Sequence, residues 1–129
     1  MGAVTRRVLV VEDEMLVAMM IEDMLVSLGH HVLGPAMQLS DALELAESEA
    51  LDFAVLDVNL GRDQRSYPIA ARLRERGIPF VFITGYGAAG LVDEFRGVTT
   101  LRKPIEPQEL ERVLGAPPPT PDQAAAGLG

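Results

Sequence analysis

The chain has 129 residues, no cysteine, and a formal net charge of −8 that comes from 11 basic and 19 acidic side chains. This length suits one domain with a sizeable hydrophobic core and leaves too little for a second independent one. The lack of thiols excludes disulfides, thiolate metal sites and thiol catalysis, and the acidic charge disfavours direct binding to nucleic acid or to anionic lipid.

Short apolar runs alternate with longer amphipathic ones in the first half of the chain. The segment Arg7–Val11 is continuously apolar from Val8 onward, which is typical of a strand buried on both faces. His31–Gly34 is predicted to be a second strand that breaks at Pro35, and Ser40–Ala50 a second helix. Between the two strands, apolar residues at helical spacing predict a helix over Met15–Leu28. Its apolar stripe is Leu16, Met20, Met24 and Leu28, widened by Val17, Ile21 and Leu25.

The same alternation continues in the second half. Phe53–Asp57 is an apolar strand that ends on a carboxylate, and a polar loop through Ser66 leads into a third helix that ends at Gly77. Phe80–Thr84 is the most hydrophobic strand.

A helix is expected after Thr84, but glycines interrupt any helical register there, so we expect a loop or a frayed turn instead. These glycines are Gly85, Gly87, Gly90 and Gly97. A short strand over Thr99–Arg102 and a last helix over Glu106–Leu114 follow.

These elements predict one α/β domain. Five strands that alternate with four or five helices imply a parallel sheet covered on both faces, because each parallel connection needs a crossover. We expect this domain over residues 6–115, between a flexible N-terminus (1–5) and a disordered tail rich in proline, alanine and glycine (116–129). In such sheets, ligands bind at the carboxyl ends of the strands.

The residues at those strand ends are polar: Glu12 and Asp13 follow the first strand, and Asp57, Thr84 and Lys103 end or follow the third, fourth and fifth. Three carboxylates in one pocket repel one another unless a hard cation or a proton relieves the repulsion, and Mg²⁺ is the natural candidate. Lys103 and Thr84 offer a positive charge and a hydroxyl to phosphoryl oxygens. Asp57 is the predicted nucleophile because it ends a central buried strand, and the other two acids are the predicted metal holders.

In this order, Glu12-Asp13, Asp57, Thr84 and Lys103-Pro104 resemble the receiver domain of two-component response regulators, over about residues 6–114. The resemblance implies a flavodoxin-like, doubly wound sheet with strand order 2-1-3-4-5. It implies an aspartyl phosphate at Asp57, formed by transfer from the phosphohistidine of a sensor kinase. It also implies that Asp13, Asp57 and the backbone carbonyl of Asn59 hold Mg²⁺, while Glu12 orients a water on the metal. Such a domain is not an enzyme acting on other molecules, because it catalyses only its own phosphorylation and dephosphorylation.

The segment Phe82-Ile83-Thr84-Gly85-Tyr86 resembles an alphaproteobacterial subgroup of single-domain receivers with a Phe-Ala-Thr-Gly-aromatic motif. In that subgroup a mobile segment replaces the fourth helix, so the resemblance implies that this helix is short or disordered. Receivers usually carry an aromatic switch residue three positions before the lysine, and Thr100 stands there in this chain.

Other notable residues have simpler structural interpretations. We interpret Glu14 as an acidic residue that suits a helix N-terminus. His30 and His31 are interpreted as structural, because neighbours on a strand point to opposite faces and cannot chelate together. Met15, Met19, Met20 and Met24 are predicted to be mostly core. The arginines near the third helix are assigned to local ion pairs, namely Arg62, Arg65, Arg72, Arg74 and Arg76.

Other functions are weighed against these residues. A haloacid dehalogenase-like phosphatase also uses an aspartate nucleophile with Mg²⁺, but its general acid would be Asn59 here, which cannot protonate a leaving group. A nucleotide-binding module is disfavoured because no glycine-rich loop follows the first strand. A receiver-like interaction module that is never phosphorylated remains an alternative, although the acid, threonine and lysine set is complete.

The expected partners are a sensor histidine kinase and a downstream protein or a competing receiver, with no nucleic acid and no membrane. We expect a stand-alone domain that acts as a phosphate sink, a shuttle or an adaptor and docks through its first helix and the loop after Thr84. No apolar run approaches the about 20 residues needed to cross a bilayer, and residues 1–7 do not resemble a signal peptide. We therefore expect a cytoplasmic protein.

Overall fold

The computed structural model describes residues 5–61, 63–85 and 91–115. In chain order its elements are β1 (Arg7–Val11), α1 (Met15–Ser27), β2 (His31–Ala36), α2 (Leu39–Ser48), β3 (Phe53–Asp57), α3 (Tyr67–Glu75), β4 (Phe80–Thr84), the short 3₁₀ turn η2 (Asp93–Phe95), β5 (Thr100–Arg102) and α4 (Pro107–Gly115). The described strands form one five-stranded parallel sheet of order β2-β1-β3-β4-β5. The predicted fold and strand order are therefore confirmed.

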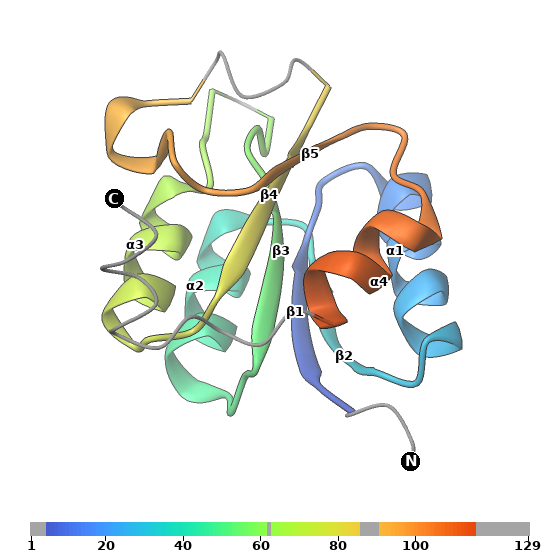
Figure 1. Cartoon of the computed structure of the whole chain (residues 1–129). Coiled ribbons are helices and arrows are strands. Elements are labelled where there is room, and N and C mark those ends of the chain that lie inside the picture. The colour runs from blue at the N-terminus through green and yellow to red at the C-terminus, as the bar shows by residue number, and fades with distance from the viewer. Residues whose placement is uncertain (1–4, 62, 86–90, 116–129) are drawn as a thin grey trace, which may run out of the picture.

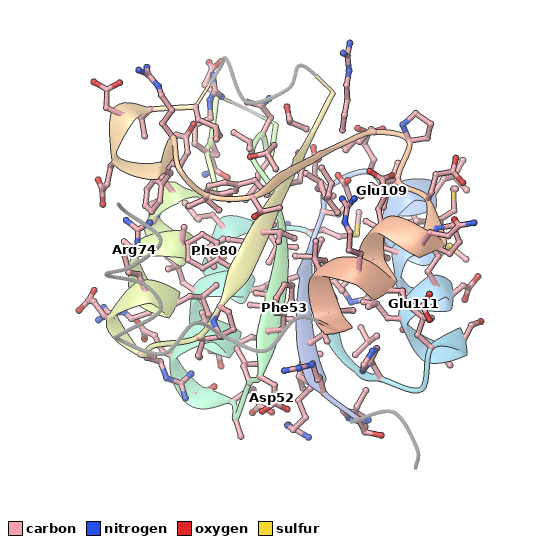
Figure 2. All side chains as sticks on the ribbon, viewed as in Figure 1. Asp52, Phe53, Arg74, Phe80, Glu109 and Glu111 are labelled. Atoms are coloured by element: carbon pink, nitrogen blue, oxygen red, sulfur yellow. The ribbon has the colours of Figure 1, made fainter. Side chains whose placement is uncertain are left out.

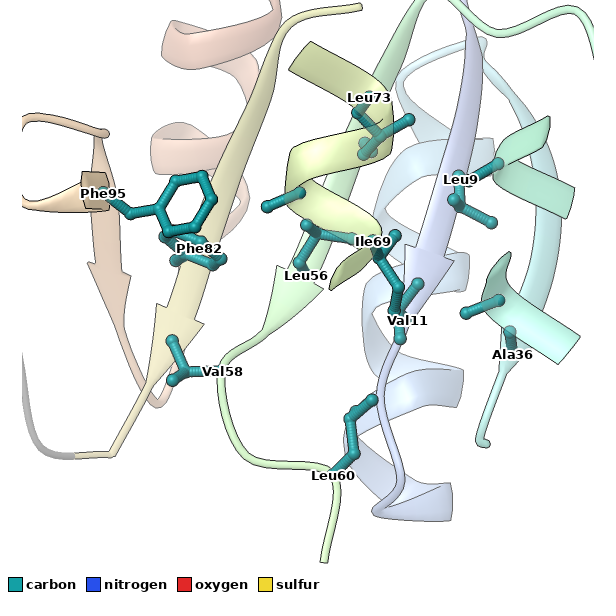
Figure 3. Close-up of a cluster of buried hydrophobic side chains, with 14 of the residues drawn as sticks. Leu9, Val11, Ala36, Leu56, Val58, Leu60, Ile69, Leu73, Phe82 and Phe95 are labelled. Atoms are coloured by element: carbon teal, nitrogen blue, oxygen red, sulfur yellow. The ribbon is translucent and has the colours of Figure 1, made fainter. Parts of the chain in front are cut away.

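Helices cover both faces of the sheet. In Figure 1, α2 and α3 lie on one side of the strands, and α1 and α4 lie on the other. Neighbouring residues of β1 face opposite cores: Leu9 and Val11 pack with α2 and α3, whereas Val8 and Val10 pack with α1 and α4. Figure 3 shows the first of these cores. Because both faces of the central strands are covered, these strands appear in the sequence as continuous apolar runs.

The buried face of α1 agrees with the predicted stripe only in part. The helix buries Ile21 and Leu25 as predicted, together with Ala18, whereas Leu16 and Met20 are exposed. Met15 and Met19 are also exposed, so the prediction that the methionines are mostly core is wrong for these three and holds in part for Met24, which packs against the core. α1 carries apolar residues around most of its circumference, so helical periodicity alone cannot identify the side that faces the sheet.

The connection from β4 to β5 contains, in its described part, only the turn η2. This agrees with the predicted short turn in place of a full helix. Phe95 of this turn is buried, stacks on Tyr67 of α3 with ring centroids 5.4 Å apart, and meets Phe82 edge to face. Arg74 lies over the Phe95 ring, on the side of the sheet where Phe80 also lies (Figure 2). Residues 86–90, the N-terminal residues 1–4 and the predicted tail (116–129) lie outside the described residues.

β2 continues past its predicted break. It runs to Ala36, and its pairing with β1 shifts register between Leu9 and Val11. Gly34 has a φ of +97°, and a Cβ at this position would lie 2.6 Å from the backbone nitrogen of Ala36 and 2.9 Å from the carbonyl oxygen of Val10. This glycine therefore marks an irregularity inside the strand, where two backbones approach closely, and not the end of the strand.

Replacing Gly34 with alanine tests this close approach. We expect Gly34→Ala to lower the free energy of unfolding by at least about 2 kcal/mol, because the left-handed backbone and the overlap with two backbone atoms both penalise a side chain. Gly29→Ala is the matched control, since Gly29 has a similar φ of +91° but nothing within 4 Å of the added carbon. Urea unfolding followed by circular dichroism measures both variants, and equal losses would contradict a role for the close approach.

Candidate functional site

A cleft of about 760 Å³ opens at the carboxyl ends of the strands. Its lining includes Asp13, Asp57, Asn59, Thr84 and Lys103. The residues that the sequence analysis placed at separate strand ends therefore meet around one cavity. The backbone that carries these residues is rigid, because each residue lies at the end of a strand of the buried sheet or shortly after it.

Backbone hydrogen bonds continue the sheet into the cleft and fix where these side chains begin. The Glu12 amide donates to the Ala36 carbonyl over 3.0 Å, which holds the end of β1 against β2. The Lys103 amide donates to the Thr84 carbonyl over 2.9 Å. This backbone hydrogen bond places Lys103 beside the end of β4, independently of the contacts of its side chain.

The Lys103 ammonium sits among three carboxylates. Its Nζ lies 2.9 Å from Oε1 of Glu12, 3.1 Å from Oε1 of Glu14 and 3.2 Å from Oδ2 of Asp57. The interpretation of Glu14 as only a helix-terminal charge is therefore wrong, since this exposed residue before α1 is also a partner of the lysine. The available signal was the run of three acids after β1, but the sequence does not show which of them the lysine reaches.

Burial controls the ionisation of this cluster. Glu12 is fully buried and Asp57 almost so. Burial, together with a hydrogen bond to Asp57, raises the pKa of Glu12 to about 8 although Lys103 opposes the shift. Burial also raises the pKa of Asp57, against the lowering effects of Glu12 and Lys103. Burial lowers the pKa of Lys103, but its carboxylate partners outweigh this effect and keep the pKa above its ordinary value. Lys103 therefore keeps its charge, and burial favours the protonated form of Glu12.

The chain folds back immediately after Asp57. The Asn59 amide donates to Oδ1 of Asp57 over 3.3 Å, while Lys103 contacts the other oxygen, Oδ2. Within the described part of the fold-back, the carbonyl oxygens of Val58, Gly61 and Gln64 accept backbone hydrogen bonds, and the carbonyl of Asn59 does not.

The acidic residues fit a hard divalent cation. One carboxylate oxygen from each of Glu12, Asp13, Glu14 and Asp57 lies within 4.8 Å of the others. The φ of Gly61 is +74°, and a Cβ there would lie 3.0 Å from Oδ2 of Asp13, so a glycine leaves room for that carboxylate. An all-oxygen donor set of this kind suits Mg²⁺ better than a metal that prefers nitrogen or sulfur.

The two histidines lie away from this cleft. His31 pairs with Arg7, at the amino end of the sheet, and Nδ1 of His30 accepts a hydrogen bond from the Arg6 amide over 3.1 Å. Burial lowers the pKa of His30. These contacts support the structural interpretation of both residues.

Comparison with known proteins agrees with the fold and the site. The family model of the response regulator receiver domain matches residues 8–114, and the chain belongs to this family. The family-level resemblance inferred from Asp57, Thr84 and Lys103 is thus confirmed. The family acts in two-component signalling, and phosphorylation and Mg²⁺ binding are general to it.

Several individual proteins are similar to the chain. It is 39% identical to SdrG from Sphingomonas melonis Fr1, whose solution structure matches with a TM-score of 0.77 over 88% of this chain and 96% of that chain. A BeF3-activated conformation of SdrG matches with a TM-score of 0.72 at the same identity, over 84% of this chain and 92% of that chain. The transcriptional regulatory protein PdtaR of Mycobacterium tuberculosis is 30% identical over 115 residues, which are 89% of this chain and 56% of PdtaR. The chain thus spans about half the length of this curated relative.

The raised pKa of Glu12 predicts how stability varies with pH when no metal is bound. Between about pH 4.5 and 8, the folded chain retains a proton that the unfolded chain releases, so raising the pH removes stability. We expect the free energy of unfolding in EDTA to fall by a few kcal/mol across this window, because one pKa unit corresponds to about 1.4 kcal/mol.

Glu12→Gln should flatten this dependence, since the glutamine cannot ionise. Glu111→Gln is the control, because Glu111 is exposed on α4 (Figure 2). Urea unfolding at a series of pH values measures the effect, and a wild-type slope retained in Glu12→Gln would show that another group causes it.

Proposed function

We propose that this chain accepts a phosphoryl group on Asp57 from the phosphohistidine of a sensor histidine kinase and passes the signal on through protein contacts. The observation that carries the proposal is the contact of 3.2 Å between the Lys103 ammonium and Oδ2 of Asp57, in an open cleft that Thr84 also lines. A nearly buried carboxylate that faces both a lysine and solvent suits an acceptor of an anionic group.

The proposed reaction is an in-line phosphoryl transfer. An ionised oxygen of Asp57 attacks the phosphorus, the bond between phosphorus and the imidazole nitrogen breaks, and its electron pair leaves with the neutral imidazole. The product is an acyl phosphate on Asp57. Lys103 exchanges a carboxylate contact for a phosphoryl oxygen, and the Thr84 hydroxyl donates to another.

Asp13, Asp57 and the backbone carbonyl of Asn59 would hold Mg²⁺ in this reaction, and Glu12 would orient one of its water ligands. When bound, the ion offsets the repulsion between the carboxylates and the phosphoryl oxygens. The compact oxygen cluster and the space that Gly61 leaves beside Asp13 support this assignment.

The alternatives receive less support from the site. A phosphatase of the haloacid dehalogenase type needs a general acid two residues after the nucleophile, and Asn59 cannot serve as one. A module that is never phosphorylated would not need Asp57, Thr84 and Lys103 to meet in one cleft. The existence of a BeF3-activated state in SdrG also favours phosphorylation, because beryllofluoride mimics a phosphoryl group.

The proposed kinase docks on α1. The exposed apolar side chains of this helix begin directly after Glu14, beside the cleft, and are Met15, Leu16, Met19 and Met20. A groove of about 270 Å³ between α1 and the residues after β5 adds Val17 and Ile105 to this surface. A downstream protein or a competing receiver would be the next partner, and a cytoplasmic location is part of the proposal. Within the described residues, no helix is long and apolar enough to span a membrane.

The proposed acceptor is tested by incubation with acetyl phosphate and Mg²⁺. We expect intact-mass spectrometry to show one phosphoryl adduct on the wild type and none on Asp57→Ala or Asp57→Asn, because the attacking oxygen is lost. Asp52→Asn is the matched control, since Asp52 is an exposed aspartate at the other end of the same strand, where it binds the Arg7 amide. An adduct of equal yield in Asp57→Ala would exclude Asp57 as the acceptor.

The proposed metal site is tested by thermal unfolding with and without Mg²⁺. We expect Mg²⁺ to raise the melting temperature of the wild type and Asp13→Asn to weaken the apparent affinity about tenfold or more, because a charged oxygen ligand is lost. Asp23→Asn, which removes an exposed carboxylate from α1, should respond to Mg²⁺ as the wild type does. An unchanged Mg²⁺ response in Asp13→Asn would remove Asp13 from the site.

A further inference from the structure

The fold-back after Asp57 places one arginine beside the nucleophile. Hydrogen bonds of 3.0 Å from the Leu60 amide to the Gln64 carbonyl, and from the Ser66 amide to the Val58 carbonyl, bracket a pair of facing residues. This pair is Asn59 and Arg65, joined as an antiparallel bridge. In a pair of this type the two residues do not hydrogen-bond to each other, and their side chains lie close together on one face.

Alternate residues of an extended backbone point to opposite faces, so the buried residues of the fold-back show which face Asn59 and Arg65 occupy. Val58, Leu60 and Ser66 are buried, so their face of the fold-back is turned to the protein interior. Asn59 and Arg65 occupy the opposite face and line the cleft together with Asp57. The position of Arg65 at the cleft thus follows from the backbone pairing and does not depend on the conformation of a flexible side chain alone.

Arg65 differs in its contacts from the other described arginines of this region. Arg72 pairs with Glu47, the Arg74 guanidinium lies over Phe95, and Arg76 donates to the carbonyl of Ala46. Among the described residues, no carboxylate lies within ion-pair distance of Arg65. The assignment of these arginines to local ion pairs is therefore wrong for Arg65, Arg74 and Arg76 and holds for Arg72, while Arg62 lies outside the described residues.

The negative charge of the cleft indicates a function for the Arg65 guanidinium. Four clustered acids face the single ammonium of Lys103, which three of them already contact. A phosphoryl donor that carries negative charge must approach this surface against repulsion. A guanidinium at the cleft offsets that repulsion and can bind two phosphate oxygens at once.

We propose that Arg65 is a binding residue for the phosphoryl group, which it contacts as the group enters the cleft and after it is attached to Asp57. This inference rests on the proposed function of the site. The positive charge of Arg65 also affects metal binding. It repels a divalent cation in the cleft, so Arg65 strengthens binding of the phosphoryl group and weakens binding of Mg²⁺.

The variant Arg65→Gln tests both consequences in the full chain. With Mg²⁺ at saturation, we expect phosphorylation by acetyl phosphate to slow about fivefold and the affinity for BeF3⁻, measured by isothermal titration calorimetry, to fall by a similar factor. In the absence of phosphodonor we expect Mg²⁺ to bind about twofold more tightly than in the wild type. Arg65→Lys should keep the wild-type affinity for Mg²⁺ and recover part of the affinity for BeF3⁻, because it retains the charge but loses the paired donors.

Arg112→Gln is the control for net charge, since Arg112 is exposed on α4 and does not line the cleft. A fold-back that is merely damaged in Arg65→Gln would weaken Mg²⁺ and BeF3⁻ binding together, and that result would overturn the inference. Wild-type values for both ligands would overturn it as well. Failure of the wild type to take up phosphate would count against the proposed function instead, because BeF3⁻ and Mg²⁺ binding report on Arg65 without phosphoryl transfer.

Discussion

The structure depends on one ammonium group held among carboxylates at the end of a buried sheet. Removing Glu12 and Asp57 from water is costly, and the contacts of 2.9 and 3.2 Å to Lys103 offset this cost only in part. The raised pKa of Glu12 is the sign of that incomplete balance. The site therefore retains excess negative charge, which a divalent cation or a proton can neutralise. A cluster that is incompletely neutralised in this way responds strongly to any ion or group that enters the cleft.

The parallel sheet makes such a cluster possible because it brings residues far apart in the chain to one edge. Every residue of β3 is buried, so Asp57 is carried into the cleft by a strand with little freedom to move. Close backbone approaches complete the arrangement. Gly34 lets β2 continue beside β1, where Ala36 then holds Glu12, and Gly61 leaves room for Asp13. The same core packing that stabilises the sheet thus also sets the distances between the charged groups.

The sequence was informative where one physical signal dominates. Continuous apolar runs such as Arg7–Val11 and Phe53–Asp57 identified the buried strands, and the polar residue after each run identified the cleft. The buried face of α1 could be predicted only in part, through Ile21 and Leu25, because a helix that is apolar on most sides has no clear periodicity. The roles of Glu14 and Arg65 also depend on three-dimensional information: the reach of Lys103 across the cleft in the first case, and the register of the fold-back in the second.

Receivers usually carry an aromatic residue on the last strand, and this chain places its aromatic packing on other elements. β5 has Thr100 there, and its hydroxyl donates back to the Val98 carbonyl over 3.1 Å. The aromatic packing comes instead from Tyr67, Phe82 and Phe95, on α3, β4 and η2. Tyr67 follows the fold-back that carries Arg65, and its hydroxyl accepts a hydrogen bond from the Val92 amide, directly after Leu91 of the cleft lining. Two walls of the cleft are thus fixed to the same aromatic cluster, so a displacement of either wall must be accommodated by the packing of Tyr67.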